Sequence, residues 1–419
     1  MAWVSSKRLV LEGMLAFAPG LYGRWEVWKA RPRTADAPIV ASGSASRQRL
    51  LLIDHDFPEV DRDAGSRAIA SFAALLLEAG MDVVFWAAST APSLAGRHWL
   101  HAAGVQPLGR NETGPLDAWL SSDQGFSSAV LSRPLVAAMY LPVVRRHVRG
   151  VCLYYGHDIH YQRLESKSAT TELKHGVWER WLMRVVERRL WREADVVLYP
   201  SRDEAQAVNI YRHGLALTAS AHMFPLWTVK AEVPASFPGV ADRKGLLFVG
   251  SKGHQPNVDG LDWFLSEVAP LLQHALGAQC PLTVVGSDME TYQPPVAQGA
   301  EGLRILGRVD DATLSECYDS ARVVIAPLRY GGGVKGKVIE AISKGVPCAM
   351  TPAAAQGLEG IEDVLPVSDD ARTYADTIGV LVSDDQAWRK ASDNAFRLLA
   401  ERYDHERYVS MLPGFFHVT

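Results

Sequence analysis

The chain has 419 residues, of which 48% are hydrophobic and 21% are charged, and its formal net charge is −4. This is the composition of a globular protein of two or three domains, and the charge gives no reason to expect a nucleic-acid partner. The four cysteines are far apart and lack the spacing of metal ligands, which indicates reduced thiols in a cytoplasmic protein. No apolar run approaches the length of a membrane span and no signal peptide is evident, so we expect neither an integral membrane protein nor a secreted one.

Residues 1–46 have the composition of an appendage to the folded body. The run from Lys7 to Phe17 predicts one amphipathic helix, and residues 31–47 are rich in Ala, Pro, Ser and Gly, as linkers are. That helix could pack on a partner, on a membrane surface or on the rest of the chain. The sequence does not choose among these three.

From Leu50 onward, short apolar strands alternate with amphipathic helices, which predicts doubly wound parallel sheets. In a first unit we expect strands at 50–53, 82–86, 128–131, 151–155 and 196–199, with helices at 66–78, 135–148 and 171–193. In a second unit we expect strands at 246–249, 282–285, 303–306, 323–326 and 348–351, with helices at 257–276, 312–320, 334–344 and 371–403. The expected domains are 47–226 and 227–403, with a hinge at 224–234 and a C-terminal tail at 404–419. Ligands of such sheets bind at the carboxyl ends of strands, so a cleft between the domains is the expected site.

A glycine loop precedes one of these helices. An expected strand ends at Ala326, the triplet Gly331–Gly333 follows, and a helix comes next. A glycine loop at a helix N-terminus gathers free backbone N–H groups, which favours an anionic ligand. The helix dipole favours acidic residues in the first turn, so we interpret Lys335 and Lys337 there as partners of that anion. We interpret Glu340 as an acceptor for sugar or ribose hydroxyls. Taken alone, the pattern also fits a flexible turn with solvent-facing lysines.

Several motifs, in this order along the chain, resemble those of bacterial family-4 (group 1) glycosyltransferases. They are Asp61-Arg-Asp-Ala-Gly-Ser66, Gly156-His-Asp-Ile-His160, Leu247-Phe-Val-Gly-Ser251, His254-Gln-Pro-Asn-Val-Asp259, Gly307-Arg-Val309, the run from Ala326 to Ala341, and Gly345-Val-Pro347. The resemblance covers about residues 48–405. It implies the α/β GT-B fold, two Rossmann-like domains facing a cleft. It also implies retaining sugar transfer from a nucleotide sugar to a glycan or lipid-linked acceptor, as in surface polysaccharide biosynthesis, with no metal or other cofactor.

The resemblance also implies roles for individual residues. Glu340 resembles the glutamate that holds the ribose hydroxyls, and Lys335 lies where the family's cation meets the pyrophosphate. His157 resembles the histidine that contacts the transferred sugar, although a capped or core histidine is the alternative. His157, Lys335 and Glu340 are therefore the expected catalytic residues. The expected donor-binding residues are Gly65, Ser66, Gly250, Ser251, Arg308, Val309, Arg329, Gly332, Gly333, Val334 and Lys337.

The chain departs from the family pattern at two positions. Gly332 stands where relatives have the first of two glutamates, and Ser251 stands where many have a phosphate-binding arginine. Four cations could supply the missing charge: Lys252, Arg329, Lys335 and Lys337. Asp61 and Asp63 have the spacing of a metal-binding pair, but we expect no metal there.

Three other classes of function compete with a transferase. A catalytically silent nucleotide-sugar-binding subunit would account for Gly332. A GT-B nucleotide-sugar epimerase would need a second cleft glutamate, which we do not find. An NAD-dependent dehydrogenase would need a Gly-x-Gly-x-x-Gly motif after a strand, which is also missing.

The helix expected at 171–193 has a basic and aromatic face. The face carries, at one-turn spacing, Arg180, Arg184 and Arg188, beside Trp178 and Trp181. Such a face suits an anionic membrane surface, which would make a cytoplasmic enzyme peripheral at the inner face of the membrane. The alternative is an ordinary solvated face whose charge is offset by Glu179 and Glu187. Asp203 and Glu204, at the start of a later helix, are interpreted as helix-capping acids.

Overall fold

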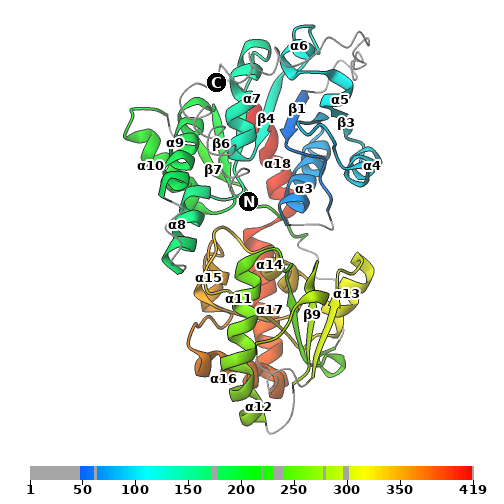
Figure 1. The fold of residues 1–419 in the computed structure, drawn as a ribbon, viewed down its shortest axis with the longest axis vertical. Coiled ribbons are helices and arrows are strands. Elements are labelled where there is room, and N and C mark those ends of the chain that lie inside the picture. The colour runs from blue at the N-terminus through cyan, green and yellow to red at the C-terminus, as the bar shows by residue number, and fades with distance from the viewer. Residues whose placement is uncertain are drawn as a thin grey trace. The chain divides into compact units, whose positions relative to one another are not determined.

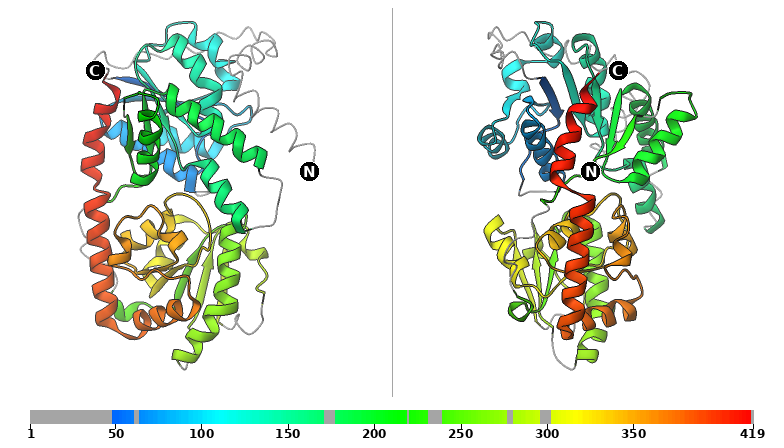
Figure 2. Two further views of the ribbon diagram at one scale, coloured as in Figure 1. Left: turned by 90° about the vertical axis from the view of Figure 1, so that its left-hand side faces the viewer. Right: turned by 180° about the vertical axis from the view of Figure 1, so that it is seen from behind.

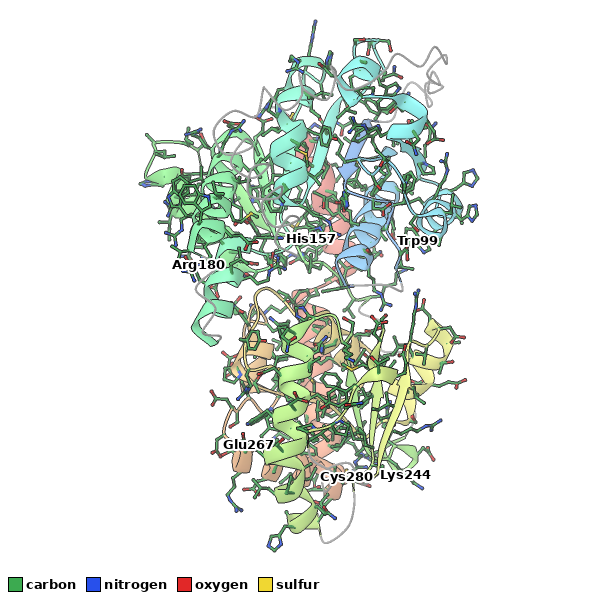
Figure 3. The ribbon with its side chains drawn as sticks, in the orientation of Figure 1. Trp99, His157, Arg180, Lys244, Glu267 and Cys280 are labelled. Atoms are coloured by element: carbon green, nitrogen blue, oxygen red, sulfur yellow. The ribbon has the colours of Figure 1, made fainter. Side chains whose placement is uncertain are left out.

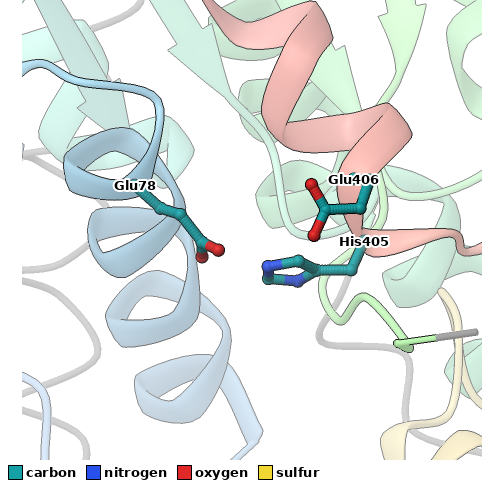
Figure 4. Close-up of side chains that lie close together, drawn as sticks. All are labelled: Glu78, His405 and Glu406. Atoms are coloured by element: carbon teal, nitrogen blue, oxygen red, sulfur yellow. The ribbon is translucent and has the colours of Figure 1, made fainter. Parts of the chain in front are cut away.

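The computed structural model describes residues 48–60, 64–170, 177–218, 220–230, 239–276, 280–295 and 302–417. The chain divides into two compact units, Met1–Leu226 with Glu406–Thr419, and Trp227–His405. The chain returns to the first unit between His405 and Glu406, at the start of helix α18 (Figure 4). The expected N-terminal helix and linker, the pair Asp61 and Asp63, and part of the expected hinge lie outside the described residues.

The first unit contains a seven-stranded parallel sheet in the order β3-β2-β1-β4-β5-β6-β7 (Figure 1). Its strands are β1 Arg49–Asp54, β2 Asp82–Ala87, β3 Gln106–Gly109, β4 Ser128–Ser132, β5 Cys152–Tyr155, β6 Val196–Tyr199 and β7 Ala221–Met223. All five expected strands are confirmed. The two that the sequence did not predict are the edge strands β3 and β7, which are short and lack an apolar run because an edge strand has only one neighbour.

Helices cover both faces of this sheet (Figure 1, Figure 2). They are α3 Ala64–Glu78, α4 Leu94–Ala102, α5 Arg110–Thr113, α6 Leu116–Leu120, α7 Pro134–His147, α8 His160–Thr170, α9 Val177–Glu193, α10 Arg202–His213, α18 His405–Met411 and the 3₁₀ turn η6 Leu412–Phe416. On one face, Leu51 of β1 is buried in one cluster with Val143 of α7 and Leu190 of α9. On the other, Phe72 of α3 stacks on Tyr155 at 4.4 Å between ring centroids.

The C-terminal aromatic residues belong to this second face of the first unit. Phe224 lies edge-on to Phe72 at 5.3 Å and to Tyr408 at 5.3 Å, and Phe415 is 6.2 Å from it. The segment that the sequence presents as a tail therefore contributes buried rings to the first core.

The second unit contains a five-stranded parallel sheet in the order β10-β9-β8-β11-β12. Its strands are β8 Leu246–Val249, β9 Leu282–Val285, β10 Leu303–Gly307, β11 Val323–Ala326 and β12 Cys348–Met350, which confirms all five expected strands. Its helices are α11 Gln255–Trp263, the π-helical turn η3 Phe264–Val268, α12 Ala269–Leu276, α13 Asp311–Ser320, α14 Gly336–Ser343, α15 Pro352–Ala355, α16 Ala371–Ser383 and α17 Asp385–Arg402, with 3₁₀ turns at η2 Val240–Asp242, η4 Met289–Thr291 and η5 Ile361–Asp363.

Two helix predictions for this unit need correction. The region 371–403 is two helices, because Asp384 ends α16 and its carboxylate accepts the N–H groups of Gln386 and Ala387 at the start of α17. The helix expected from Val334 begins at Gly336, because Lys335 is extended and acts as its N-cap residue. Lys335 is therefore outside the first helical turn.

The strand order reverses once in each sheet, between β1 and β4 in the first unit and between β8 and β11 in the second. In open parallel sheets, ligands bind beside the carboxyl ends of strands at this reversal. The predicted pair of Rossmann-like sheets is confirmed, and the two reversals are where functional side chains should lie. Among the described residues, no helix is both long and apolar enough to cross a membrane.

Candidate functional site

The glycine loop leaves β11 at the reversal of the second sheet. Gly331 has φ 138° and Gly333 has φ 70°, which are backbone conformations that favour glycine. The Lys335 side chain is buried and turns back on this loop, where its Nζ donates to the carbonyl oxygens of Gly332, at 3.1 Å, and Gly333. The cation therefore holds the shape of the loop that carries it, next to the N-terminus of α14.

Three more glycines lie at the carboxyl ends of neighbouring strands. Gly250 follows β8, Gly286 follows β9, and Gly307 ends β10. The Gly250 N–H donates to the Val285 carbonyl and the Gly286 N–H to the Gly307 carbonyl, both at 2.8 Å. A Cβ on Gly286 would lie 2.0 Å from the Gly250 carbonyl oxygen, so the two backbones meet with no room for a side chain.

Lys337 bonds within the second unit. Its Nζ donates to Asn257 Oδ1 at 2.7 Å and lies 4.7 Å from the centre of the Phe248 ring. Asn257 in turn donates to the Ser251 carbonyl at 2.9 Å, so Lys337 supports the loop after β8. Burial, together with the charge of Lys335, lowers the pKa of Lys337 to about 7. Its direct contact with a diphosphate stays a prediction.

Glu340 lies in the second turn of α14 and is half-buried. Its Oε2 accepts a hydrogen bond from the hydroxyl of the buried Tyr318 at 3.1 Å.

Arg329, after β11, is half exposed and forms a two-bond ion pair with Asp259, with distances of 2.7 and 2.9 Å. Its charge is therefore partly offset already. Arg308 is exposed and Val309 half-buried in the segment after β10.

In the first unit, His157 follows β5 and joins a polar cluster at the reversal between β1 and β4 (Figure 3). Its Nε2 is 3.0 Å from the Ser132 hydroxyl, which donates to Asp54 Oδ2 at 3.4 Å. Arg133 Nε donates to the same carboxylate at 2.9 Å. Each of these residues stands at the end of β1, β4 or β5, so the sheet brings them together. Gly65 and the buried Ser66 are in the first turn of α3.

Three carboxylates lie near His157, and their contacts there were not predicted from the sequence. Glu187, taken for a surface acid of α9, is fully buried and accepts the backbone N–H groups of His160 and Tyr161 at the start of α8. Glu204 lies in the first turn of α10 beside the N-cap Ser201, as the capping interpretation expects, but it is buried and also accepts the Ile159 N–H. Asp158 is buried and pairs with His160, 2.6 Å away, and with Arg163, 3.1 Å away.

Burial disfavours the charged forms of both Asp158 and His160, but the attraction between the two charges outweighs this desolvation cost. The charges of His160 and Arg163 hold the pKa of Asp158 well below its ordinary range, and Asp158 raises the pKa of His160. The ion pair therefore contributes its full stability below the ordinary pKa of histidine, 6.5, and loses it as the pH rises through the raised value.

His160→Gln is accordingly expected to destabilise the chain more at about pH 5.5 than at about pH 8.5. Loss of a charge-assisted hydrogen bond should cost about 1.5–3 kcal/mol at the lower pH. Urea unfolding of the full chain at both pH values measures the difference. His98→Gln, at an exposed position of α4, is the control. Equal destabilisation at the two pH values would contradict a charged His160.

Comparison with known proteins finds a family match within the second unit. Residues 243–384 match the family model described as glycosyl transferases group 1. The match contains the loops after β8, β10 and β11, and Lys335 and Glu340 with them.

Solved structures match the chain over both units. Sucrose-phosphate synthase from Thermosynechococcus elongatus is 16% identical, with a TM-score of 0.60 over 88% of this chain and 98% of that one. HepE from Anabaena, solved in complex with UDP and glucose, is 15% identical, with a TM-score of 0.60 over 88% of this chain and 99% of that one. At these identities the matches show the fold, and the predicted GT-B class is confirmed.

One curated protein matches part of the chain. It is a Klebsiella pneumoniae protein described as an uncharacterized 44.6 kDa protein in the cps region, 22% identical over 198 residues. The alignment covers 45% of this chain and 50% of that protein, so the chain spans about half the length of this relative.

Proposed function

We propose that the chain is a retaining, metal-independent glycosyltransferase that moves a sugar from a nucleotide sugar to a glycan or lipid-linked acceptor. The observation that carries this proposal is the match to group 1 glycosyltransferases over the glycine loop, Lys335 and Glu340 beside the β8–β11 reversal. The similar fold of HepE, whose structure holds UDP and glucose, supports a nucleotide-sugar donor. The cps-region relative supports a role in surface polysaccharide biosynthesis.

The chemistry follows from charge. Departure of the sugar leaves additional negative charge on a nucleoside diphosphate, and the positive end of α14 with Lys335 next to it would stabilise that charge. Glu340 would hold the ribose hydroxyls and so fix the donor in place. In the first unit, His157 is the proposed contact of the transferred sugar. Retention is proposed to occur by substitution on one face of the sugar within an ion pair.

Binding of the nucleoside diphosphate, the product that remains when the donor has lost its sugar, tests the proposal without knowledge of the acceptor. Melting temperatures would be measured with a panel of nucleoside diphosphates, because a ligand that binds only the native state raises the melting temperature. We expect one base to give a shift that Glu340→Ala removes. No shift with any of the panel would contradict a donor site in this chain.

Activity is expected to survive an excess of chelator. A helix N-terminus and lysine can neutralise a diphosphate without a divalent ion. Release of nucleoside diphosphate would be measured with EDTA and again after magnesium or manganese is added. An absolute requirement for either ion would contradict metal independence and direct attention to Asp61 and Asp63.

Gly332 favours a second candidate, a silent subunit that binds nucleotide sugars without transferring them. Such a subunit would show the same thermal shifts as an enzyme. Release of nucleoside diphosphate from a nucleotide sugar, which only an enzyme gives, therefore separates the two candidates.

We also propose that the start of α9 contacts an anionic membrane on its cytoplasmic side. Val177, Trp178 and Trp181 are 64%, 57% and 41% exposed, and the two indole rings stack at 4.8 Å between centroids. Arg180 is half-buried beside them (Figure 3). Arg188 is exposed, one turn beyond Arg184. Large exposed indoles next to arginines suit a membrane interface.

The structure changes the charge balance of this face. Glu187 is buried, so it does not offset the arginines at the surface. Arg184 pairs with Glu165 and lies 4.9 Å from the centre of the Tyr161 ring, so it is already engaged within the first unit. Arg188 lies 5.3 Å from the centre of the Tyr211 ring but is exposed, and Arg180 lies beside the exposed indoles, so these two arginines are the targets of the test.

Co-sedimentation with anionic vesicles is expected to fall when Arg180 and Arg188 are changed to Glu. Each arginine near an anionic surface contributes about 1 kcal/mol, so the double variant should bind at least about tenfold more weakly. Trp178→Ser with Trp181→Ser should also weaken binding, and added salt should weaken that of the parent chain. Equal recovery in the supernatant with neutral and anionic vesicles would instead indicate an ordinary solvated helix.

A further inference from the structure

The segment from Gly156 to Tyr161, which we call the loop of His157, comprises the connection between β5 and α8 and the first two residues of α8. Three consecutive backbone N–H groups of this loop donate to two carboxylates. Ile159 donates to Glu204 Oε1 at 3.1 Å, His160 to Glu187 Oε1 at 3.0 Å, and Tyr161 to Glu187 Oε2 at 3.0 Å. Both oxygens of Glu187 therefore accept from the first two residues of α8, shortly after His157.

Neither carboxylate belongs to the loop. Glu187 comes from the middle of α9 and is fully buried, and Glu204 comes from the first turn of α10 and is buried. Each is held in place by a further donor. The Tyr199 hydroxyl donates to Glu187 at 3.4 Å, and the Ser201 hydroxyl donates to Glu204 at 2.8 Å. We call Glu187 and Glu204 the carboxylate pair.

The rest of the loop is also fixed. A Cβ on Gly156 would lie 2.4 Å from the Tyr199 ring, so the loop passes directly over that ring. Asp158 is held by His160 and Arg163. The His157 side chain reaches in the other direction, to Ser132 at the end of β4. The backbone on both sides of His157 is thus pinned, and its imidazole is directed to the polar cluster at the strand ends.

Stability alone does not account for the carboxylate pair. Burial raises the pKa of Glu187 and of Glu204 to about 7 in each case, above the ordinary value of 4.5. For an acid, a raised pKa in the folded state means that ionisation reduces stability as the pH rises from the ordinary value through the raised one. Apolar side chains at buried sites are often at least as stabilising as buried charges. What the carboxylates provide is a fixed position for three N–H groups.

We propose that Glu187 and Glu204 are positioning residues for His157, which hold its loop so that the imidazole is presented to the sugar that is transferred. This inference rests on the proposed function for the role of His157, but the hold on the loop can be measured without turnover. Because Glu187 and Glu204 come from α9 and α10, these two helices determine the geometry of the site.

The test compares Glu187→Gln and Glu204→Gln with Glu193→Gln in the full chain. Glu193 is on the same helix as Glu187 but pairs with Arg189 and has no bond to the loop, so it is the matched control.

Amide hydrogen exchange over 156–161 should become about tenfold or more faster in the two test variants, with the rest of the first unit unchanged. The turnover number should fall at least about tenfold, because a small misplacement of a catalytic group is costly. The KM for the donor and the affinity for the nucleoside diphosphate should stay within about twofold, since those depend on the second unit.

Three results would overturn the inference. Exchange over 156–161 that matches the Glu193→Gln control would show that the pair does not hold the loop. Faster exchange throughout the first unit would show a general loss of stability, with no specific role at His157. A turnover number equal to that of the control would show that the position of the loop does not matter. If the parent chain turns over no donor, the proposed function fails, and the exchange data still decide whether the pair holds the loop.

Discussion

Glu340→Ala is expected to reduce nucleotide-sugar use about 10- to 150-fold, because hydrogen bonds from hydroxyls to a charged acceptor contribute about 1.5–3 kcal/mol. The side chain is half-buried in the second turn of α14, where it accepts from the Tyr318 hydroxyl at 3.1 Å. A ribose bound beside the glycine loop would donate to the same carboxylate. The measurement is kcat/KM for the donor, with the circular dichroism spectrum as a check on folding.

Tyr318→Phe is the matched control for this prediction. It removes the hydroxyl that bonds to Glu340 but leaves the carboxylate in place. If the carboxylate acts on the donor, the control should retain activity within about threefold while Glu340→Ala does not. Donor kinetics of Glu340→Ala within a factor of about two of the parent would contradict the assignment of Glu340.

Gly286→Ala is expected to destabilise the second unit by at least about 1–3 kcal/mol and to weaken donor binding as well. Gly286 has φ 154°, and an added Cβ would lie 2.0 Å from the Gly250 carbonyl oxygen. That neighbour is backbone and cannot rotate away, so the loop after β8 must shift. Urea unfolding gives the stability change, and thermal shift with the nucleoside diphosphate gives the change in binding.

Gly253→Ala tests whether the effect comes from this close approach. Gly253 lies in the loop after β8, near Gly250, and a Cβ there would meet nothing within 4 Å. It should leave stability within about 0.5 kcal/mol of the parent. Similar losses from both substitutions would mean that the tight contact between Gly250 and Gly286 is unimportant.

The sequence predicted the two sheets well because buried parallel strands are short apolar runs. Leu246–Val249, Leu282–Val285 and Val323–Ala326 coincide with β8, β9 and β11. The edge strands β3 and β7 escaped because their residues, Gln106-Pro-Leu-Gly109 and Ala221-His-Met223, show neither an apolar run nor clear alternation. In β7 only Ala221 is buried, and the buried residues of β3 are Pro, Leu and Gly, which do not form the apolar run that predicts a strand.

The sequence predicted only those residues of the candidate site that lie close together in a recognisable motif. The glycine loop, Lys335 and Glu340 are local in sequence, so their placement around α14 could be foreseen. The start of α14 could not, because it depends on the extended conformation of Lys335 and its bonds back to the loop. Glu187 and Glu204 could not either, because a buried glutamate on an amphipathic helix has the same spacing as a solvated one. Only the fold places them against the backbone of the His157 loop.

The most direct test of the account is release of free nucleoside diphosphate from a panel of nucleotide sugars, measured for the parent chain and for Glu340→Ala. We expect release from at least one donor in the presence of chelator, reduced about 10- to 150-fold by the substitution. Donors that raise the melting temperature but are never turned over would contradict it and would make the chain a silent nucleotide-sugar-binding subunit.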